Sequence, residues 1–202
     1  MGYNSENRGA MEKFIIDGNT PLNGEVTPSG NKNAALPLLA ACLLTKEPVV
    51  LDNVPDIIDI SNMRCLLTSL GVEIIELGPN TLKVHAKSVT PADLDPDLCR
   101  KIRASILLAG PMTARAGELV LPPPGGDVIG RRRVDTHILA LQKLGVQVNY
   151  DRQFLFKADR LNGADILLDE ASVTATENAI MACCLARGTS VIRNAASEPH
   201  IQ

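Results

Sequence analysis

The sequence predicts an α/β protein made of repeated units, and three observations support this fold class. The 202 residues are 45% hydrophobic and 21% charged, which is typical of a globular chain. Apolar residues follow a helical spacing in some stretches and alternate, as in strands, in others. Two pairs of similar stretches recur far apart, which indicates a repeated supersecondary unit. Because aromatic residues make up only 2%, the core is expected to be aliphatic.

The first pair of similar stretches has a nearly constant spacing. Residues 22–24 and 161–163 both read Leu-Asn-Gly, and residues 34–53 fall on residues 175–194 when 141 is added to each position. In both copies an apolar helical pattern leads into a short strand pattern. For the later copy we expect a strand at 165–168, a helix at about 173–187 and a strand at 190–193.

The second pair links residues 70–72 with residues 144–146, which both read Leu-Gly-Val. Each follows a helical pattern and precedes alternating residues, so each predicts a helix, a glycine cap and a strand. Asn80 and the pair Asp151-Arg152 then predict hairpin turns. The repeated unit is therefore a strand, a helix, a strand, a helix and a hairpin.

These similarities divide the chain into units at about 22–88, 95–158 and 161–202. The third unit has room for a strand, a helix and a strand only. Each unit of a repeat protein buries an apolar face against its neighbours, so an incomplete unit leaves core surface open. The sequence therefore predicts a fragment or a truncated reading frame.

The composition excludes several classes of partner. Two percent aromatic residues, with no Trp, provide few platforms for stacking nucleic-acid bases, and the net charge of −3 argues against a general polyanion binder. No apolar run reaches the roughly 20 residues of a membrane span. Five cysteines, an odd number without Cys-x-x-Cys spacing, favour a reducing compartment. We therefore expect a cytoplasmic protein with no nucleic-acid or membrane partner.

The most distinctive segment is residues 122–135, Pro-Pro-Pro-Gly-Gly-Asp-Val-Ile-Gly-Arg-Arg-Arg-Val-Asp. Prolines stiffen its start, glycines permit unusual backbone angles, and three arginines crowd its end. It predicts a mobile, charged functional loop, with a solvated surface turn as the alternative. Gly125 and Gly130 match half of a phosphate-binding P-loop. The other half fails, because Arg131 and Arg132 replace the Lys and the hydroxyl residue.

Three further segments combine polar residues with a predicted helix start. Lys32 precedes an apolar run at 36–44, where a cation near free N–H groups suits an anionic ligand. A Ser or Asn cap beside a solvated Lys is the alternative. Residues 100–105 are expected to open a helix that continues to Leu108, although their arginines could simply extend into solvent. Residues 169–173 end a strand and enter a helix, and Ser172 is a plausible cap.

Several of these motifs together resemble the UDP-N-acetylglucosamine 1-carboxyvinyltransferase family of enolpyruvyl transferases. The match runs from about Met11 to the end and covers roughly the N-terminal half of a family member. It implies an inverted α/β barrel of βαβαββ units with pseudo-threefold symmetry and inward helices, the third unit being incomplete. The motifs are Lys32-Asn33-Ala34-Ala35-Leu36-Pro37, Arg103-Ala104-Ser105, Gly125 to Gly130, Arg132, Val134-Asp135 and Asn194 to Pro199.

The resemblance also implies a domain organisation and a reaction. Residues 1–10 are expected to be a disordered extension, residues 11–21 to add a strand to a missing C-terminal domain, and residues 22–202 to form an enolpyruvyl transferase domain. The family transfers the enolpyruvyl group of phosphoenolpyruvate to the 3-hydroxyl of UDP-N-acetylglucosamine and releases phosphate. No metal or organic cofactor is expected, and the implied partners are these two small molecules.

Carried over by motif, the family's functional residues fall into three groups. Asp127 takes the position of the general acid. Lys32, Asn33 and Arg132 are implied to bind phosphoenolpyruvate. The residues implied to bind the sugar nucleotide are Arg103, Arg132, Arg133, Val134, Asp135, Thr136, Glu170, Ala171, Ser172 and Val173. Asp135 is alternatively the N-cap of the following helix.

The chain departs from the family at three positions. Asp127 stands where most members carry Cys, and a carboxyl pKa near 3.9 is about 3 units too low for an acid at neutral pH, a deficit of about 4 kcal/mol. We hypothesise that bound anionic substrate and loop closure raise this pKa. A carboxylate is also a poor nucleophile toward fosfomycin, so resistance is expected. Arg133 replaces a usual Pro, and Glu170 a frequent Lys.

Two alternatives remain open at this point. The chain could resemble 5-enolpyruvylshikimate-3-phosphate synthase, which shares the fold, or it could be a sugar-nucleotide-binding remnant without catalysis. The family's aspartate base and several phosphoenolpyruvate-binding arginines lie in its second half. This chain alone is therefore expected to be inactive.

Overall fold

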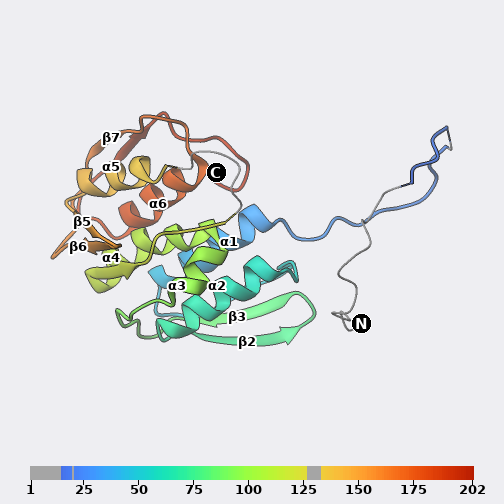
Figure 1. Cartoon of the computed structure of the whole chain (residues 1–202), viewed down its shortest axis with the longest axis horizontal. Coiled ribbons are helices and arrows are strands. Elements are labelled where there is room, and N and C mark those ends of the chain that lie inside the picture. Colours follow the sequence, from blue (N-terminus) through green and yellow to red (C-terminus); the bar gives the residue numbers. More distant parts are fainter. Residues whose placement is uncertain (1–14, 20, 127–132) are drawn as a thin grey trace.

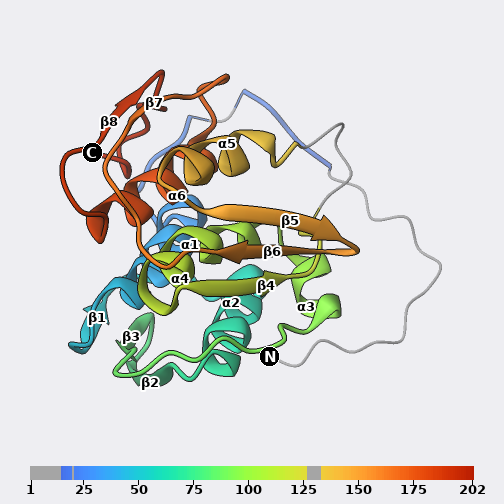
Figure 2. The same cartoon turned by 90° about the vertical axis from the view of Figure 1, so that its left-hand side faces the viewer.

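The computed structural model of the chain describes residues 15–19, 21–126 and 133–202. Helices occupy its interior and small β-sheets lie around them (Figures 1 and 2). Among the described residues, the largest fully buried side chains are Leu, Ile and Met, joined by Phe156. The expected aliphatic core is thus confirmed.

The first unit contains three helical segments and one sheet. Its strands pair in the order β1-β3-β2, and both pairings are antiparallel. The elements are α1 (Lys32–Ala41), the 3-10 helix η1 (Cys42–Leu44), β1 (Val49–Leu51), α2 (Ile58–Ser69), β2 (Glu73–Gly78) and β3 (Thr81–His85).

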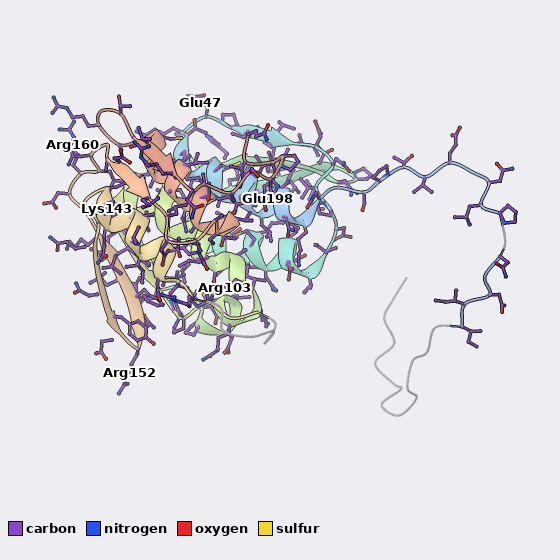
Figure 3. All side chains as sticks on the ribbon, turned by 90° about the horizontal axis from the view of Figure 1, so that it is seen from above. Glu47, Arg103, Lys143, Arg152, Arg160 and Glu198 are labelled. Carbon is purple, nitrogen blue, oxygen red and sulfur yellow. The ribbon has the colours of Figure 1, made fainter. Side chains whose placement is uncertain are left out.

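The second unit repeats this sheet, with order β4-β6-β5 and antiparallel pairing throughout. Arg152 lies at the tip of its β5–β6 hairpin (Figure 3). The elements are α3 (Pro96–Lys101), the 3-10 helix η2 (Arg103–Leu108), α4 (Ala109–Ala116), β4 (Glu118–Leu121), α5 (Asp135–Lys143), β5 (Gln147–Asp151) and β6 (Gln153–Lys157).

The third unit consists of β7 (Asp165–Leu167), α6 (Val173–Cys184) and β8 (Val191–Arg193), with the two strands parallel. This confirms the predicted strand, helix and strand, although the helix ends at Cys184 rather than near 187. Helix α6 packs against α4 and α5 in the middle of the molecule (Figure 2).

The prediction that every unit begins with a strand is wrong for the described part of the first two units. Residues 21–31 form no strand and, with residues 15–19, extend away from the body of the molecule (Figure 1). The second unit begins with helix α3. The Asp95 side chain accepts a hydrogen bond from the Asp97 N–H at 2.7 Å, and Pro96 occupies the first helical position. Both features favour a helix start.

The two predicted glycine caps are confirmed at the ends of α2 and α5. Gly71 and Gly145 have φ of 91° and 102°, in the left-handed region where glycine is least strained. In the first cap the Gly71 N–H donates to the Thr68 carbonyl and the Val72 N–H to the Leu67 carbonyl, at 3.0 and 3.1 Å. The second cap has the same pair of hydrogen bonds, the pattern of a Schellman motif.

Left-handed asparagines support both the hairpin and the repeat predictions. Asn80 and Arg152 have φ of 58° and 63° in the hairpin turns of the first two units. Asn53 and Asn194, which the offset of 141 relates, have φ of 54° and 58°. Asparagine tolerates this conformation better than most residues, so the local residue type favours the turns at Asn53, Asn80 and Asn194, although not the one at Arg152.

Arg115 at the end of α4 holds the second unit against the first. Its guanidinium donates to the backbone carbonyls of Leu43 and Thr45, each at 2.6 Å, and to those of Ala86 and Lys87. One planar cation therefore satisfies carbonyls at the end of η1 and after β3. Within the described residues, no helix has both the length and the apolarity needed to span a lipid bilayer.

Candidate functional site

Of two hollows lined by described residues, the smaller holds several of the predicted site residues. The larger, of about 510 Å³, lies between α2 and the β2–β3 hairpin. It is lined by Asp56 and by Arg64 and Glu76, which pair at 2.6 Å, and it contains none of the predicted site residues. The smaller, of about 360 Å³, lies where the N-terminal ends of α1 and α6 meet the start of η2. We refer to this smaller hollow as the central pocket.

Lys32 and Asn33 line the central pocket from the first turn of α1. The Asn31 side chain caps this helix by accepting a hydrogen bond from the Asn33 N–H at 2.8 Å, which confirms an Asn cap. The Lys32 ammonium lies 2.7 Å from a carboxylate oxygen of Asp59, on the first turn of α2. A lysine at a helix N-terminus is unfavourable by itself, because its positive charge opposes the helix dipole. The ion pair with Asp59 offsets this repulsion.

Arg103 reaches the central pocket from a break between helices, and not from the single helix expected over residues 100–108. Helix α3 ends at Lys101, Ile102 is extended with φ −131° and ψ 130°, and η2 begins at Arg103. The Ser105 hydroxyl donates to the Ile102 carbonyl at 3.0 Å, so a side chain competes with the regular helical pattern. Arg103 also donates to the Arg133 carbonyl at 2.5 Å and thereby holds the far end of the glycine-rich segment.

Gly125 and Gly126 bring the glycine-rich segment against α3. Their N–H groups donate to the carbonyls of Cys99 and Arg100 at 3.0 and 2.9 Å. A Cβ on Gly125 would lie 1.8 Å from the Arg100 carbonyl oxygen, and Gly126 has φ +94°. Both positions therefore require glycine, as the sequence indicates. Gly126 lines the central pocket, whereas Asp127 and Arg132 lie outside the described residues.

Residues 133–136 form a ridge beside the central pocket. Arg133 pairs with Asp135 at 2.7 Å, and this hydrogen-bonded carboxylate raises the pKa of the guanidinium. Asp135 is the first residue of α5, Val134 occupies the N-cap position, and no side chain caps this helix. The alternative that Asp135 is the N-cap is therefore wrong. Buried Thr136 donates to Asp169 at 2.5 Å and so links the ridge to the loop before α6.

Residues 170–173 lead into α6. Ser172 is the N-cap and its hydroxyl accepts from the Ala175 N–H at 3.4 Å, which confirms the predicted cap. Val173 lines the central pocket, whereas Glu170 and Ala171 are exposed outside it. The structure thus brings Lys32, Asn33, Arg103 and Val173 to one pocket. Those predicted residues that are described but do not line it are Arg133, Val134, Asp135, Thr136, Glu170, Ala171 and Ser172.

The predicted site residues did not include five titratable residues that line the central pocket: Asp59, Lys101, Glu177, Glu198 and His200. His200 Nε2 lies 3.0 Å from one oxygen of Glu177, and the other Glu177 oxygen is buried without a hydrogen-bond partner among the described residues. Burial, and then the nearby Glu198 carboxylate, raise the pKa of Glu177 to about 7. A carboxylate within an apolar helical run is a signal that could have identified Glu177.

The central pocket can therefore bind an anion and exchange protons. Lys32 from α1 and Arg103 from η2 supply positive charge to the pocket. The N-terminal end of α6, which also favours an anion, lies at the same pocket. Glu177 supplies a carboxyl group that titrates near neutrality. Arg103 and Glu198, both labelled in Figure 3, lie 95 positions apart in the sequence, so only the fold brings them to one pocket.

The sequence and the fold have counterparts in known proteins. The family model of EPSP synthase (3-phosphoshikimate 1-carboxyvinyltransferase) matches residues 16–202. The chain belongs to this enolpyruvyl transferase family. Among curated relatives, the UDP-N-acetylglucosamine 1-carboxyvinyltransferase of Bradyrhizobium diazoefficiens is 57% identical over 190 residues, which cover 94% of this chain and 44% of that protein. The protein of the same name from Treponema denticola is 55% identical over 192 residues, covering 95% and 45%.

These relatives confirm the resemblance to the N-terminal half of a UDP-N-acetylglucosamine 1-carboxyvinyltransferase. The chain spans less than half the length of either relative. Solved enolpyruvyl transferases confirm the fold class. NikO from Streptomyces tendae superposes with a TM-score of 0.76 at 23% identity, covering 91% of this chain and 43% of that one. EPSP synthase from Acinetobacter baumannii gives 0.70 at 17% identity, covering 88% and 42%.

Proposed function

We propose that this chain forms the N-terminal half of an enolpyruvyl transferase that acts on phosphoenolpyruvate and UDP-N-acetylglucosamine in cytoplasmic peptidoglycan synthesis. The observation that carries the proposal is the convergence of Lys32, Asn33 and Arg103 in the central pocket. Sequence identity above 50% to two proteins named for this activity supports the choice of substrates.

The proposed reaction requires three proton transfers, and it forms one carbon–oxygen bond and breaks another. The 3-hydroxyl oxygen of the sugar bonds to C2 of phosphoenolpyruvate, a base takes the hydroxyl proton, and the methylene carbon gains a proton. The tetrahedral intermediate then loses phosphate and a methyl proton, which restores the double bond. Cations must stabilise the carboxylate and phosphate throughout, and arginine binds both in bidentate geometry.

Within this proposal each sequence-derived residue has a role. Asp127 is the general acid, and its neighbour Gly126 lines the central pocket. Lys32, Asn33 and Arg132 bind phosphoenolpyruvate. The sugar nucleotide is bound by Arg103 and Arg132 and extends along the ridge of residues 133–136 to residues 170–173. The Arg103 contact with the Arg133 carbonyl supports this path, because it joins the pocket to the ridge.

The proposed domain arrangement assigns residues 22–202 to one domain and residues 11–21 to a strand of the second. Residues 1–10, predicted to be an extension, lie outside the described residues. The exposure of Ile15 and Ile16, at 77% and 85%, supports a partner for residues 11–21, because adjacent large apolar side chains on a surface favour burial. The second domain would supply the base and further arginines.

The proposed function is tested by reconstitution. The chain is mixed with the C-terminal half of the Bradyrhizobium diazoefficiens relative, and phosphate release from phosphoenolpyruvate is measured with UDP-N-acetylglucosamine or with shikimate 3-phosphate. We expect the mixture to release phosphate with UDP-N-acetylglucosamine and not with shikimate 3-phosphate. The unmixed chain should be inactive with both. Turnover with shikimate 3-phosphate instead would favour the alternative activity, that of a 5-enolpyruvylshikimate-3-phosphate synthase. Binding of UDP-N-acetylglucosamine without turnover by any mixture would favour a binding remnant.

A second experiment addresses Asp127 in the reconstituted protein. Fosfomycin alkylates a thiol more readily than a carboxylate, so the protein is expected to resist it, and Asp127→Cys should restore sensitivity. An adduct on Asp127 in the unsubstituted protein would contradict this. A substrate-bound titration that leaves Asp127 ionised at neutral pH would contradict its role as the acid.

A further inference from the structure

A buried chain of hydrogen bonds leads from the contact between α4 and α6 to the central pocket. Asn178 is fully buried and His137 is 1% exposed. Asn178 Nδ2 lies 2.9 Å from His137 Nδ1, and His137 Nε2 lies 3.2 Å from the Thr174 hydroxyl oxygen. Thr174 lines the central pocket. The chain therefore connects the protein interior to a side chain that a ligand can reach.

The Asn178 amide has only one orientation that satisfies its neighbours. Its Oδ1 accepts from the Gly110 N–H at 2.8 Å, and its Nδ2 donates to the Ile106 carbonyl at 2.8 Å. Exchanging the two atoms would place an oxygen against a carbonyl and an NH₂ against an N–H. Since Nδ2 carries the donors, the Nδ1 atom of His137 must be the acceptor.

This orientation determines the tautomer of His137. Burial, assisted by the charge of Arg103, lowers the pKa of His137 to about 3, so the imidazole is neutral. A neutral imidazole that accepts at Nδ1 carries its proton at Nε2, and Nε2 then donates to Thr174. The Thr174 hydroxyl has accepted this bond, and its own proton has no acceptor among the described residues.

We propose that the Thr174 hydroxyl donates a hydrogen bond to a phosphoryl oxygen of the bound substrate, and that His137 and Asn178 are its positioning residues. The inference rests on the proposed function, since both phosphoenolpyruvate and the diphosphate of UDP-N-acetylglucosamine carry such oxygens. Thr174 is the second residue of α6, where the helix dipole favours an anion. Lys32 and Arg103 line the same pocket.

The carboxyl groups nearby are compatible with an anion at this position. Glu177 follows Thr174 by three residues on α6 and lines the same pocket. Burial and Glu198 raise the pKa of Glu177 to about 7, which reduces its negative charge at neutral pH. A phosphoryl group beside Thr174 therefore meets less repulsion than it would with Glu177 ionised. The third carboxylate of the pocket, Asp59, is paired with Lys32 at 2.7 Å.

The proposal is tested with Thr174→Val, which keeps the shape but removes the donor, and with Thr174→Ser, which keeps the hydroxyl. Phosphoenolpyruvate and UDP-N-acetylglucosamine are titrated separately into the chain by calorimetry. Thr174→Val is expected to weaken one of them by about 10- to 100-fold, the range for a hydrogen bond to a charged group, while Thr174→Ser stays near the unsubstituted affinity. The ligand that is weakened identifies whose phosphoryl oxygen Thr174 contacts.

The outcomes separate this inference from the proposed function. If the unsubstituted chain binds a ligand and Thr174→Val binds both ligands equally well, the inference is overturned and the proposed function stands. If neither the unsubstituted chain nor its mixture with the C-terminal half of the Bradyrhizobium diazoefficiens relative binds either ligand, both are overturned. If only the mixture binds, the Thr174 variants are compared in the mixture. Nitrogen NMR of labelled histidine gives a readout independent of ligand. The His137 proton is expected on Nε2, and a proton on Nδ1 would overturn the positioning role of Asn178 and His137.

Discussion

Replacing Gly110 with alanine is expected to force α4 and α6 apart, because these helices touch at this glycine. A Cβ on Gly110 would lie 2.5 Å from the Asn178 carbonyl oxygen and 2.7 Å from its Oδ1, whereas ordinary contact begins at 3.4 Å. The helices would therefore have to separate locally by roughly 0.7–0.9 Å, the shortfall in these two contacts. The same movement weakens the hydrogen bond from the Gly110 N–H to Asn178.

The energetic cost follows from three opposing contributions. Overpacking a well-packed core costs about 1–3 kcal/mol, and weakening the hydrogen bond costs about 1 kcal/mol. Alanine in place of glycine recovers about 1 kcal/mol of helix propensity. The net loss for Gly110→Ala is thus about 2 kcal/mol. In a chain of this length that loss lowers Tm by about 4–8 °C.

Urea unfolding of Gly110→Ala measures this loss directly, and Gly78→Ala is the matched control. No heavy atom lies within 4 Å of a Cβ built on Gly78, so the control should stay within about 0.5 kcal/mol of the unsubstituted chain. A lower midpoint at unchanged m-value is expected for Gly110→Ala. If Gly110→Ala unfolds at the same midpoint as Gly78→Ala, the close contact between α4 and α6 is not present in solution.

Three further substitutions are expected to change stability. The raised pKa of buried Glu177, about 7 against 4.5 in the unfolded chain, means that the folded state binds more protons, so stability falls as pH rises from about 4.5 to 7. Glu177→Gln should remove at most about 3 kcal/mol of this fall in a urea series across pH, and parallel pH curves for the two proteins would contradict the assignment. The pKa of His137 is lowered, to about 3 against 6.5 in the unfolded chain, so here the folded state binds fewer protons and stability is lost as pH falls from 6.5 toward 3. This loss is at most about 5 kcal/mol, and His137→Gln should abolish it. Arg115→Met should cost about 2–4 kcal/mol at neutral pH, because backbone carbonyls of the first unit lose their cationic donor, and an unchanged urea midpoint would show that water replaces it fully.

The features that the sequence predicted correctly depend on residues close together in the chain. The Gly71 and Gly145 caps and the turn at Asn80 require a left-handed conformation that the local residue type provides. Ser172 caps α6 through the nearby Ala175 N–H, and the spacing alone indicated it. Such local determinants can be recognised in one sequence without knowledge of the fold.

The features that the sequence did not reveal depend on distant residues or on competing side chains. The helix expected over residues 100–108 breaks at Ile102, where the Ser105 hydroxyl donates a hydrogen bond to the Ile102 carbonyl. Asn178 contacts His137 from 41 positions away, and no periodicity indicates that pairing. The composition of the central pocket likewise depends on how α1, η2 and α6 pack. Residue types suggested its cations Lys32 and Arg103, whereas Glu177 was missed although it stands within an apolar helical run.

The central claim is that Lys32, Arg103 and Val173 belong to one pocket for the two anionic substrates. Titrating the ¹⁵N-labelled chain with UDP-N-acetylglucosamine and phosphoenolpyruvate together, and assigning which backbone resonances move, tests it most directly. The account predicts shifts at these three residues and at Thr174, with none at Arg64 or Gly78 in the larger hollow. Shifts confined to the hollow between α2 and the β2–β3 hairpin, or no shifts at saturating ligand, would contradict it.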